Sequence, residues 1–230
     1  YYESEALAWE QAAFIRSRAS AGDRALGEQF LSAIQPFIWR RSLDFRQLKE
    51  IGAMSDRIRD HFSQGQAFGP GYDLKRGRGG IREIEFFAQV HQLIYGGRDP
   101  SLRVPATVDA LAALAKAGRI DGHVAARLTA HYATLRRIEH RLQMIEDQQT
   151  HSLPNQAVAL DAVARLDGKA DGAALLAALR PVTEDVAACY DQLVVERATT
   201  TGLPRDEGEL AVVLMTLGFE PPDAALRTIS

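Results

Sequence analysis

The sequence predicts an all-α protein, a helical bundle with one short extended glycine-rich arm. Apolar residues recur at spacings of three and four along most of the chain, which is the period of an amphipathic helix. No convincing strand pattern exists beyond a short stretch at Tyr72. With 46% apolar residues among 230, the chain is long enough for one large helical domain or two smaller ones.

The chain begins with three expected helices. The first covers residues 1–20, and the Gly22-Asp23 pair after it stops the helix. A second begins near Arg24, and Pro36 is expected to break or kink it because proline disrupts the helical hydrogen-bond ladder. Asp44 has the side chain of an N-cap for the third helix. Their apolar faces are formed by Ala6, Trp9 and Ala13, by Leu26, Phe30 and Ile34, and by Phe45, Leu48, Ile51, Met54 and Ile58.

A glycine- and arginine-rich arm follows at residues 65–80. Residues 72–75 can form a short extended segment, and the glycines after it permit backbone shapes that are closed to other residues. A helical pattern starts at Ile81 at once, and an extended segment that turns into a helix N-terminus suits an anion. A glycine turn at a helix start is by itself most often only a turn. Nearby arginines favour an anion-binding site, because guanidinium groups suit phosphate oxygens. The three arginines within seven residues are Arg76, Arg78 and Arg82.

The helix after the arm, over residues 81–95, is expected to be central and buried because apolar positions nearly encircle it. One narrow polar line remains, formed by Arg82, Glu85, Gln89 and Gln92. Later helices are expected over residues 107–117, from an N-cap at Asp121 to about Gln149, over 158–166, and from Ala173 to about Ala198 with Pro181 inside. A polar linker over 199–209 and a short helix over 209–218 complete the expected elements.

Composition excludes several classes of function. The net charge of -3 gives no overall attraction to nucleic acid or to an anionic membrane, so any basic function is local. No run of about 18 apolar residues predicts a membrane span, and no signal-peptide pattern opens the chain. The single cysteine, Cys189, excludes an internal disulfide, fits a reducing cytoplasm and is expected in the core.

Local motifs for catalysis are lacking. The six histidines are scattered without the spacing of zinc ligands, and no P-loop, dinucleotide fingerprint or nucleophile elbow is present. Glu83 and Glu85 stand two apart on a helix and point roughly opposite ways, so they cannot share a proton or a metal. Their expected partners are arginines, and Arg82 lies three residues from Glu85 on one face.

Several stretches resemble the bifunctional glutamine synthetase adenylyltransferase/deadenylylase family. The most specific is DLKRGRGGIREIEFFAQ at residues 73–89. Others are LIYGGRDPSLR at 93–103 and DQQTHSLP at 147–154, with shorter matches near the start of the chain at Tyr1, Tyr2, Glu3, Trp9, Glu10, residues 15–18, Gly22 and Asp23. Together the resemblance covers most of residues 1–195.

The resemblance implies which part of such an enzyme this chain is. The family has two similar halves, each with a palm and a helical region, and GRGGIREI at residues 77–84 looks like the half that removes adenylyl groups. The family's palm carries metal-binding carboxylates, after a Gly-Ser start, that this sequence lacks. We therefore expect a piece of a longer protein, without catalytic residues or metal ligands of its own, whose palm precedes Tyr1. The expected regions are helices at 1–64, the arm at 65–80, a bundle at 81–198, and a linker with the start of a next segment at 199–230.

The family's reaction implies roles for the arm. Phosphate attacks the adenylyl-tyrosine bond of glutamine synthetase and ADP is released, which requires charge neutralisation at phosphorus. The candidate phosphate- or adenylyl-binding residues are Lys75, Arg76, Arg78, Gly79, Gly80 and Arg82, where the glycines would allow close backbone approach. Asp73 is expected to steady Lys75 or reach the metals, and Glu83 and Glu85 to orient the arginines.

Two interpretations of function stay open. In the first, the chain is the helical portion of the adenylyl-removing enzyme, with glutamine synthetase and a PII signal protein as partners. Mg²⁺ and ATP, ADP or phosphate would then bind in the full enzyme, and none tightly to this chain. In the second, it is an independent helical module that docks glutamine synthetase or a PII signal protein and touches no nucleotide. A nucleic-acid-binding domain is a weak third, because aromatic residues are not interleaved with the basic ones.

Overall fold

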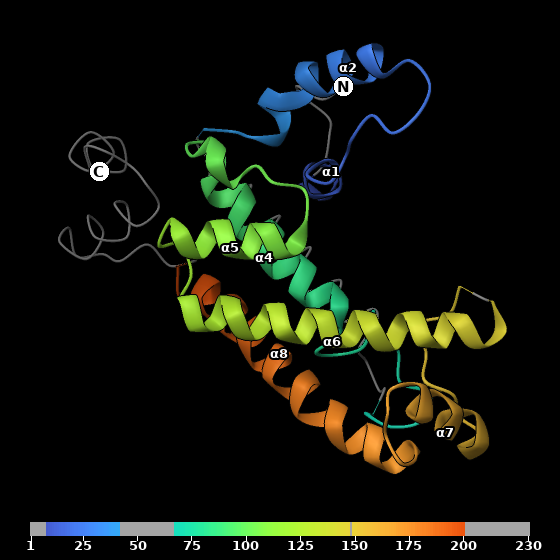
Figure 1. Cartoon of the computed structure of the whole chain (residues 1–230). Coiled ribbons are helices and arrows are strands. Elements are labelled where there is room, and N and C mark those ends of the chain that lie inside the picture. The colour runs from blue at the N-terminus through green and yellow to red at the C-terminus, as the bar shows by residue number, and fades with distance from the viewer. Residues whose placement is uncertain (1–7, 42–66, 148, 201–230) are drawn as a thin grey trace. The chain divides into compact units, whose positions relative to one another are not determined.

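The computed structural model describes residues 8–41, 67–147 and 149–200 (Figure 1). The chain divides into two units, residues 1–191 and 192–230. The described part of the second unit is residues 192–200, which are helical. The packing described below is that of the first unit.

Helices dominate the described residues, which confirms the all-α prediction. They are α1 (Ala8–Phe14), α2 (Arg24–Ile38), α4 (Ile81–Tyr95), the 3-10 helix η1 (Pro100–Leu102), α5 (Thr107–Lys116), α6 (Gly122–Glu146), α7 (Ala157–Leu166) and α8 (Gly172–Thr200). The β structure within the same residues is one isolated antiparallel bridge between Asp73 and Ser152. The extended arm predicted at Tyr72 is therefore a single bridge followed by turns.

The later helices lie close to their predicted positions, whereas the first two differ. The Asp121 side chain caps α6 by accepting from the backbone N–H groups of His123 and Val124, as predicted. α1 ends at Phe14 rather than at residue 20, because Ser17 N–H bonds to the Phe14 carbonyl in a tight turn. α2 runs through Pro36 and ends two residues later. The helices expected after Asp44 and over 209–218 lie outside the described residues.

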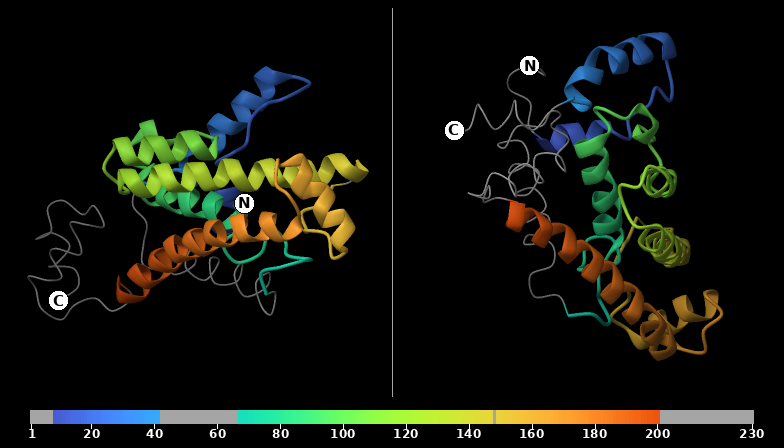
Figure 2. Two further views of the ribbon diagram at one scale, coloured as in Figure 1. Left: turned by 60° about the horizontal axis from the view of Figure 1, so that its bottom comes forward. Right: turned by 90° about the vertical axis from the view of Figure 1, so that its left-hand side faces the viewer.

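α4 forms the centre of the bundle. It contacts α1, α5 and α6, and its Phe86 ring lies 6.5 Å from that of Tyr190 in α8. Figure 2 shows α4 between the α5–α6 pair and α8. Its buried residues are Ile81, Glu83, Ile84, Phe86, Phe87, Ala88, Val90, Gln92 and Leu93. The predicted all-round burial is confirmed, and its polar line is reduced because Gln92 is buried and donates to the carbonyls of Leu102 and Val104.

The apolar stripes of the other helices are buried in most places. In α8, Leu175, Leu179, Val186 and Cys189 are buried, and the prediction of Cys189 in the core is confirmed. The stripe expected on α2 is wrong in part, since Leu26 and Phe30 are 62% and 45% exposed while Ile34 is buried. No helix in the described ranges is both long and apolar enough to cross a lipid bilayer.

Candidate ligand-binding arm at the start of α4

The arm is held by a segment that lies far away in sequence. Gly71 N–H bonds to the Leu153 carbonyl, Leu153 N–H to the Tyr72 carbonyl, and Leu74 N–H to the His151 carbonyl, each at 2.9 Å. The side chains of Tyr72 and Leu74 are fully buried. Backbone pairing with residues 151–153 therefore fixes residues 71–74 before the glycine turn begins.

Asp73 shapes the turn that follows. Its Oδ1 atom accepts from the backbone N–H groups of Lys75 and Arg76, both at 2.8 Å, and its carbonyl accepts from Gly77 N–H. These bonds make the short local turn that aspartate favours. Asp73 thus contacts the Lys75 backbone, while its expected role, to steady Lys75 or to reach the metals, stays a prediction.

The backbone donors at the start of α4 bond to the protein itself. Ile81, Arg82 and Glu83 would have free N–H groups at a helix N-terminus. In the structure these groups bond to the carbonyls of Leu74, Lys75 and Gly80. Gly80 N–H bonds to the Gly77 carbonyl, and Gly79 N–H to Oε2 of the buried Glu83 side chain. Anion binding at this turn would consequently depend on side chains.

Gly79 and Gly80 allow close approach by the protein's own backbone. Gly79 has a φ of 80°, and a Cβ atom there would lie 1.9 Å from the Thr183 carbonyl oxygen of α8. A Cβ atom on Gly80 would lie 2.7 Å from the Leu74 carbonyl oxygen. Glycine is needed at Gly79 both for the left-handed backbone and for contact with α8.

The buried Tyr72 side chain stabilises the turn. Its hydroxyl group donates to the Arg78 carbonyl oxygen. Burial, with the Glu83 and Asp73 carboxylates nearby, raises the pKa of Tyr72 well above its usual value. The phenol is therefore neutral at physiological pH and available as a donor.

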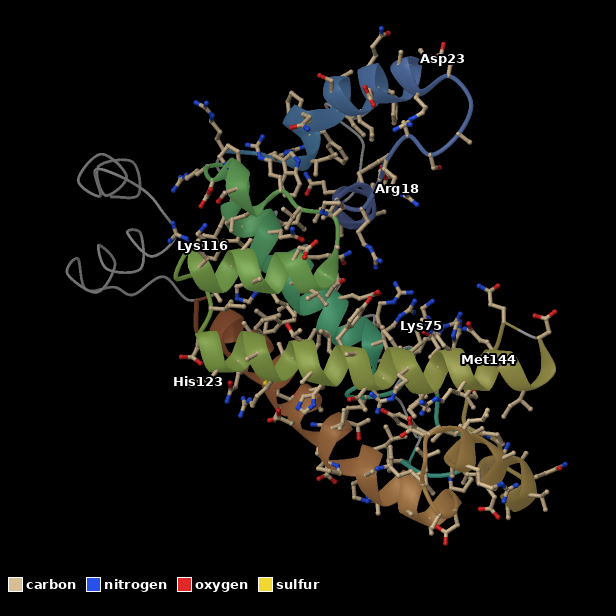
Figure 3. The ribbon with its side chains drawn as sticks, viewed as in Figure 1. Arg18, Asp23, Lys75, Lys116, His123 and Met144 are labelled. Atoms are coloured by element: carbon tan, nitrogen blue, oxygen red, sulfur yellow. The ribbon has the colours of Figure 1, made fainter. Side chains whose placement is uncertain are left out.

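The basic side chains differ in their availability. Arg78 forms an ion pair with Asp191 of α8 at 2.7 Å, and both side chains are partly exposed. The Arg82 N–H bond to the Lys75 carbonyl, 2.9 Å long, places these two residues next to each other. Figure 3 shows Lys75 beside the first turn of α4. Within the described part of the chain, the side chains of Lys75 and Arg82 make no ion pair, whereas Arg76 is exposed and has other contacts.

The expected Arg82–Glu85 pair is wrong. Glu85 pairs with Arg16, which follows α1, at 2.7 Å, and accepts from the Tyr132 hydroxyl of α6 at 3.2 Å. The reason is burial: the Glu85 side chain is mostly enclosed by these neighbours, while Arg82 is exposed. The Glu83 carboxylate accepts from the Gly79 backbone N–H, and its expected role in orienting an arm arginine stays a prediction.

A buried polar cluster beneath the arm was missed by sequence reasoning. Glu139 of α6 lies 2.5 Å from Arg136 and 2.7 Å from His151, the residue whose carbonyl holds Leu74. The family-like motif at 147–154 pointed to this segment but not to its partner. In the described ranges, no group of three or more His, Cys, Asp and Glu side chains is arranged to hold a metal ion. We therefore assign no metal ligand to these residues.

Comparison with known proteins gives one matching family model, described as GlnD PII-uridylyltransferase, over residues 52–194. Curated relatives are named "bifunctional glutamine synthetase adenylyltransferase/adenylyl-removing enzyme". That of Caulobacter vibrioides is 44% identical over 238 residues, covering 100% of this chain and 24% of the relative. That of Bradyrhizobium diazoefficiens is 42% identical, and that of Agrobacterium fabrum 41%, with the same coverage of both chains. The chain thus spans about a quarter of the length of these relatives.

Proposed function

Because the chain belongs to the GlnD PII-uridylyltransferase family and is similar along its whole length to glutamine synthetase adenylyltransferase/adenylyl-removing enzymes, we propose that it is the helical region of such an enzyme. The observation that carries the proposal is the 44% identity across 100% of the chain. The parent protein would regulate glutamine synthetase by adding and removing AMP on a tyrosine.

The sequence of the arm supports the adenylyl-removing half in particular. Residues 77–84, GRGGIREI, resemble the version of the motif in that half. The Arg-Glu pair after the glycines is the distinguishing feature, and here it is Arg82 and Glu83. Glu83 has a structural role in this motif, since its carboxylate accepts from Gly79 N–H and stabilises the turn.

The proposed reaction is phosphorolysis. An oxygen of inorganic phosphate attacks the phosphorus of the adenylyl group, the bond from phosphorus to the tyrosine oxygen breaks, and ADP leaves as the tyrosine oxygen gains a proton. Such reactions depend mostly on positioning and on neutralisation of charge at phosphorus. Lys75 and Arg82 can supply that charge, because neither is paired with a described acidic residue.

The other candidate residues take different parts in this proposal. Arg78 would reach a phosphate only by leaving Asp191, a change of small energy because partly exposed ion pairs contribute at most about 1 kcal/mol. Gly79 and Gly80 would act by shaping the turn, since their N–H groups bond internally. Arg76 would add positive charge at the exposed edge of the arm.

Substitution of Lys75 and Arg82 in the full-length protein tests the proposal. We expect K75Q and R82Q each to slow phosphate-dependent release of ADP from adenylylated glutamine synthetase about tenfold or more, as loss of a charge-stabilising donor does. Matched controls are K169Q and R165Q, which remove a half-buried lysine and an exposed arginine on or just after α7. Equal rates in all four variants and the wild type would show that the arm has no role in the reaction.

We propose glutamine synthetase as the substrate protein and a PII signal protein as a regulatory partner, both in the cytoplasm. Mg²⁺ and ATP, ADP or phosphate would bind in the full enzyme, and none of them tightly to this chain alone. The support for glutamine synthetase is the resemblance of residues 73–89 and the names of the relatives. The support for a PII protein is that resemblance and the name of the matching family. Binding of the full-length protein to purified PII protein, measured by calorimetry, tests the partner; no heat of binding in the presence of ATP and Mg²⁺ would contradict it.

A further inference from the structure

The buried carboxylate of Glu139 is a costly feature that the proposed reaction does not use directly. Its side chain, on α6, is 1% exposed. A buried carboxylate is strongly unfavourable unless it is paired with positive charge or hydrogen-bond donors. Its two oxygens meet Arg136 at 2.5 Å and His151 at 2.7 Å.

The His151 ring approaches the buried Glu139 carboxylate closely. Nδ1 of His151 and Oε1 of Glu139 lie at ion-pair distance with angles outside those of a hydrogen bond, and neither atom bonds elsewhere in the described residues. The contact at 2.7 Å favours an imidazole nitrogen that carries a proton, because a carboxylate oxygen offers only lone pairs. The pair thereby restrains the orientation of His151.

His151 also carries the backbone that holds the arm. Its carbonyl accepts from Leu74 N–H at 2.9 Å, and the Leu74 carbonyl accepts from Ile81 N–H at the first residue of α4. The next backbone bond, from Arg82 N–H to the Lys75 carbonyl, joins the two basic residues that make no ion pair within the described ranges. A continuous set of contacts therefore runs from Glu139 through His151 to Lys75 and Arg82.

We propose that Glu139 and His151 are positioning residues of the arm, which set the location of Lys75 and Arg82 for the phosphate-bearing ligand. The expected effect on catalysis rests on the proposed function. The anchoring of the arm by these two residues does not depend on it. Neither residue touches the ligand. The buried ion pair fixes the backbone at residues 151–153, and that backbone fixes the arm.

A second buried carboxylate provides a matched control. Asp167, which follows α7, pairs with Arg137 at 2.9 Å and with Arg141. Both arginines come from α6, as Arg136 does, and the Asp167 side chain is 5% exposed. The variant D167N therefore perturbs a similar buried carboxylate whose arginine partners lie on α6. It leaves the contacts of the arm unchanged.

The experiment combines amide hydrogen exchange with kinetics in the full-length protein. We expect H151A and E139Q to accelerate exchange at Leu74, Ile81 and Arg82 about tenfold, while D167N leaves these amides unchanged. H151N should restore slow exchange, because its side-chain amide can donate from the position of Nδ1. In phosphorolysis, H151A should lower kcat about tenfold with KM for adenylylated glutamine synthetase changed less than about twofold, as expected for misplaced catalytic groups.

The outcomes separate the two proposals. Faster exchange confined to the arm in H151A and E139Q, with rescue by H151N, supports the anchoring role of Glu139 and His151. Absence of adenylyl-removing activity in the wild type would overturn the proposed function but not this anchoring role. Equal effects of D167N and H151A on the arm would overturn the anchor and leave a general structural role. So would unchanged exchange in H151A, or the failure of H151N to restore it.

Discussion

At the residue scale, Tyr72 shows how one side chain organises the glycine turn. Its ring is buried and its hydroxyl group holds the Arg78 carbonyl, so the turn closes over an aromatic residue. The sequence predicted a turn here from its glycines, because glycine preference is local. It could not predict that Tyr72 and Glu83 bond to the turn, or that Glu85 pairs with Arg16, because those contacts depend on packing.

Replacing Tyr72 with phenylalanine should destabilise the protein by about 1 kcal/mol, because the Arg78 carbonyl loses its donor. Chemical denaturation measures the change in free energy of unfolding. Y95F is a suitable control, since the Tyr95 ring lies against the Arg119 guanidinium group and its hydroxyl group makes no hydrogen bond to a described residue. A Y72F variant as stable as the wild type would show that the bond contributes nothing.

Alkaline pH should destabilise the wild type more than Y72F. Burial raises the pKa of Tyr72 in the folded state, so the folded protein holds this proton more tightly than the unfolded chain. The resulting stability is complete below the unfolded value of about 10 and is lost as pH rises above it. The difference in unfolding free energy between the two proteins, measured from pH 8 upward, should therefore shrink above that point, and parallel curves would contradict the assignment.

At the element scale, α4 was predicted within its observed bounds of Ile81–Tyr95. Glycines precede and follow a strongly apolar periodic segment, so local signals and packing agree. α1 was predicted too long, because the residues after Phe14 continue a weak helical pattern that the structure replaces with a turn. The exposure of Leu26 and Phe30 on α2 was missed for a related reason: a stripe of apolar residues does not show what covers it.

Ile84→Ala should be among the more destabilising substitutions in α4. Ile84 is fully buried in the central helix, and removal of its side chain leaves a cavity, so a loss of about 2–5 kcal/mol in unfolding free energy is expected. V158A provides the comparison, because Val158 on α7 is 78% exposed. Thermal or denaturant unfolding measures both, and equal effects of the two substitutions would contradict the central place of α4.

The thiol of Cys189 should react slowly in the folded protein. It lies in the buried stripe of α8, where burial, with the Asp185 carboxylate nearby, raises its pKa. A raised pKa lowers the thiolate fraction at neutral pH, and the thiolate is the reacting form. Alkylation by iodoacetamide should accelerate strongly in denaturant, whereas a rate in native protein equal to that of a free thiol would place Cys189 at the surface.

At the scale of the whole molecule, the candidate site joins segments that the sequence keeps apart. Residues 71–74 pair with 151–153, and Gly79 meets the backbone of α8 at Thr183. The family resemblance pointed to residues 73–89 and 147–154 as two separate motifs. Their pairing could not be predicted, because backbone hydrogen bonds between distant segments leave little trace in one sequence.

The most direct test of the central claim follows isotope-labelled phosphate in the full-length protein. When the protein is incubated with adenylylated glutamine synthetase and labelled inorganic phosphate, phosphorolysis predicts that the label appears in the β-phosphate of ADP. It also predicts one unmodified tyrosine for each ADP formed. Release of unlabelled AMP, or no release of nucleotide, would contradict the assignment of this chain to the adenylyl-removing half.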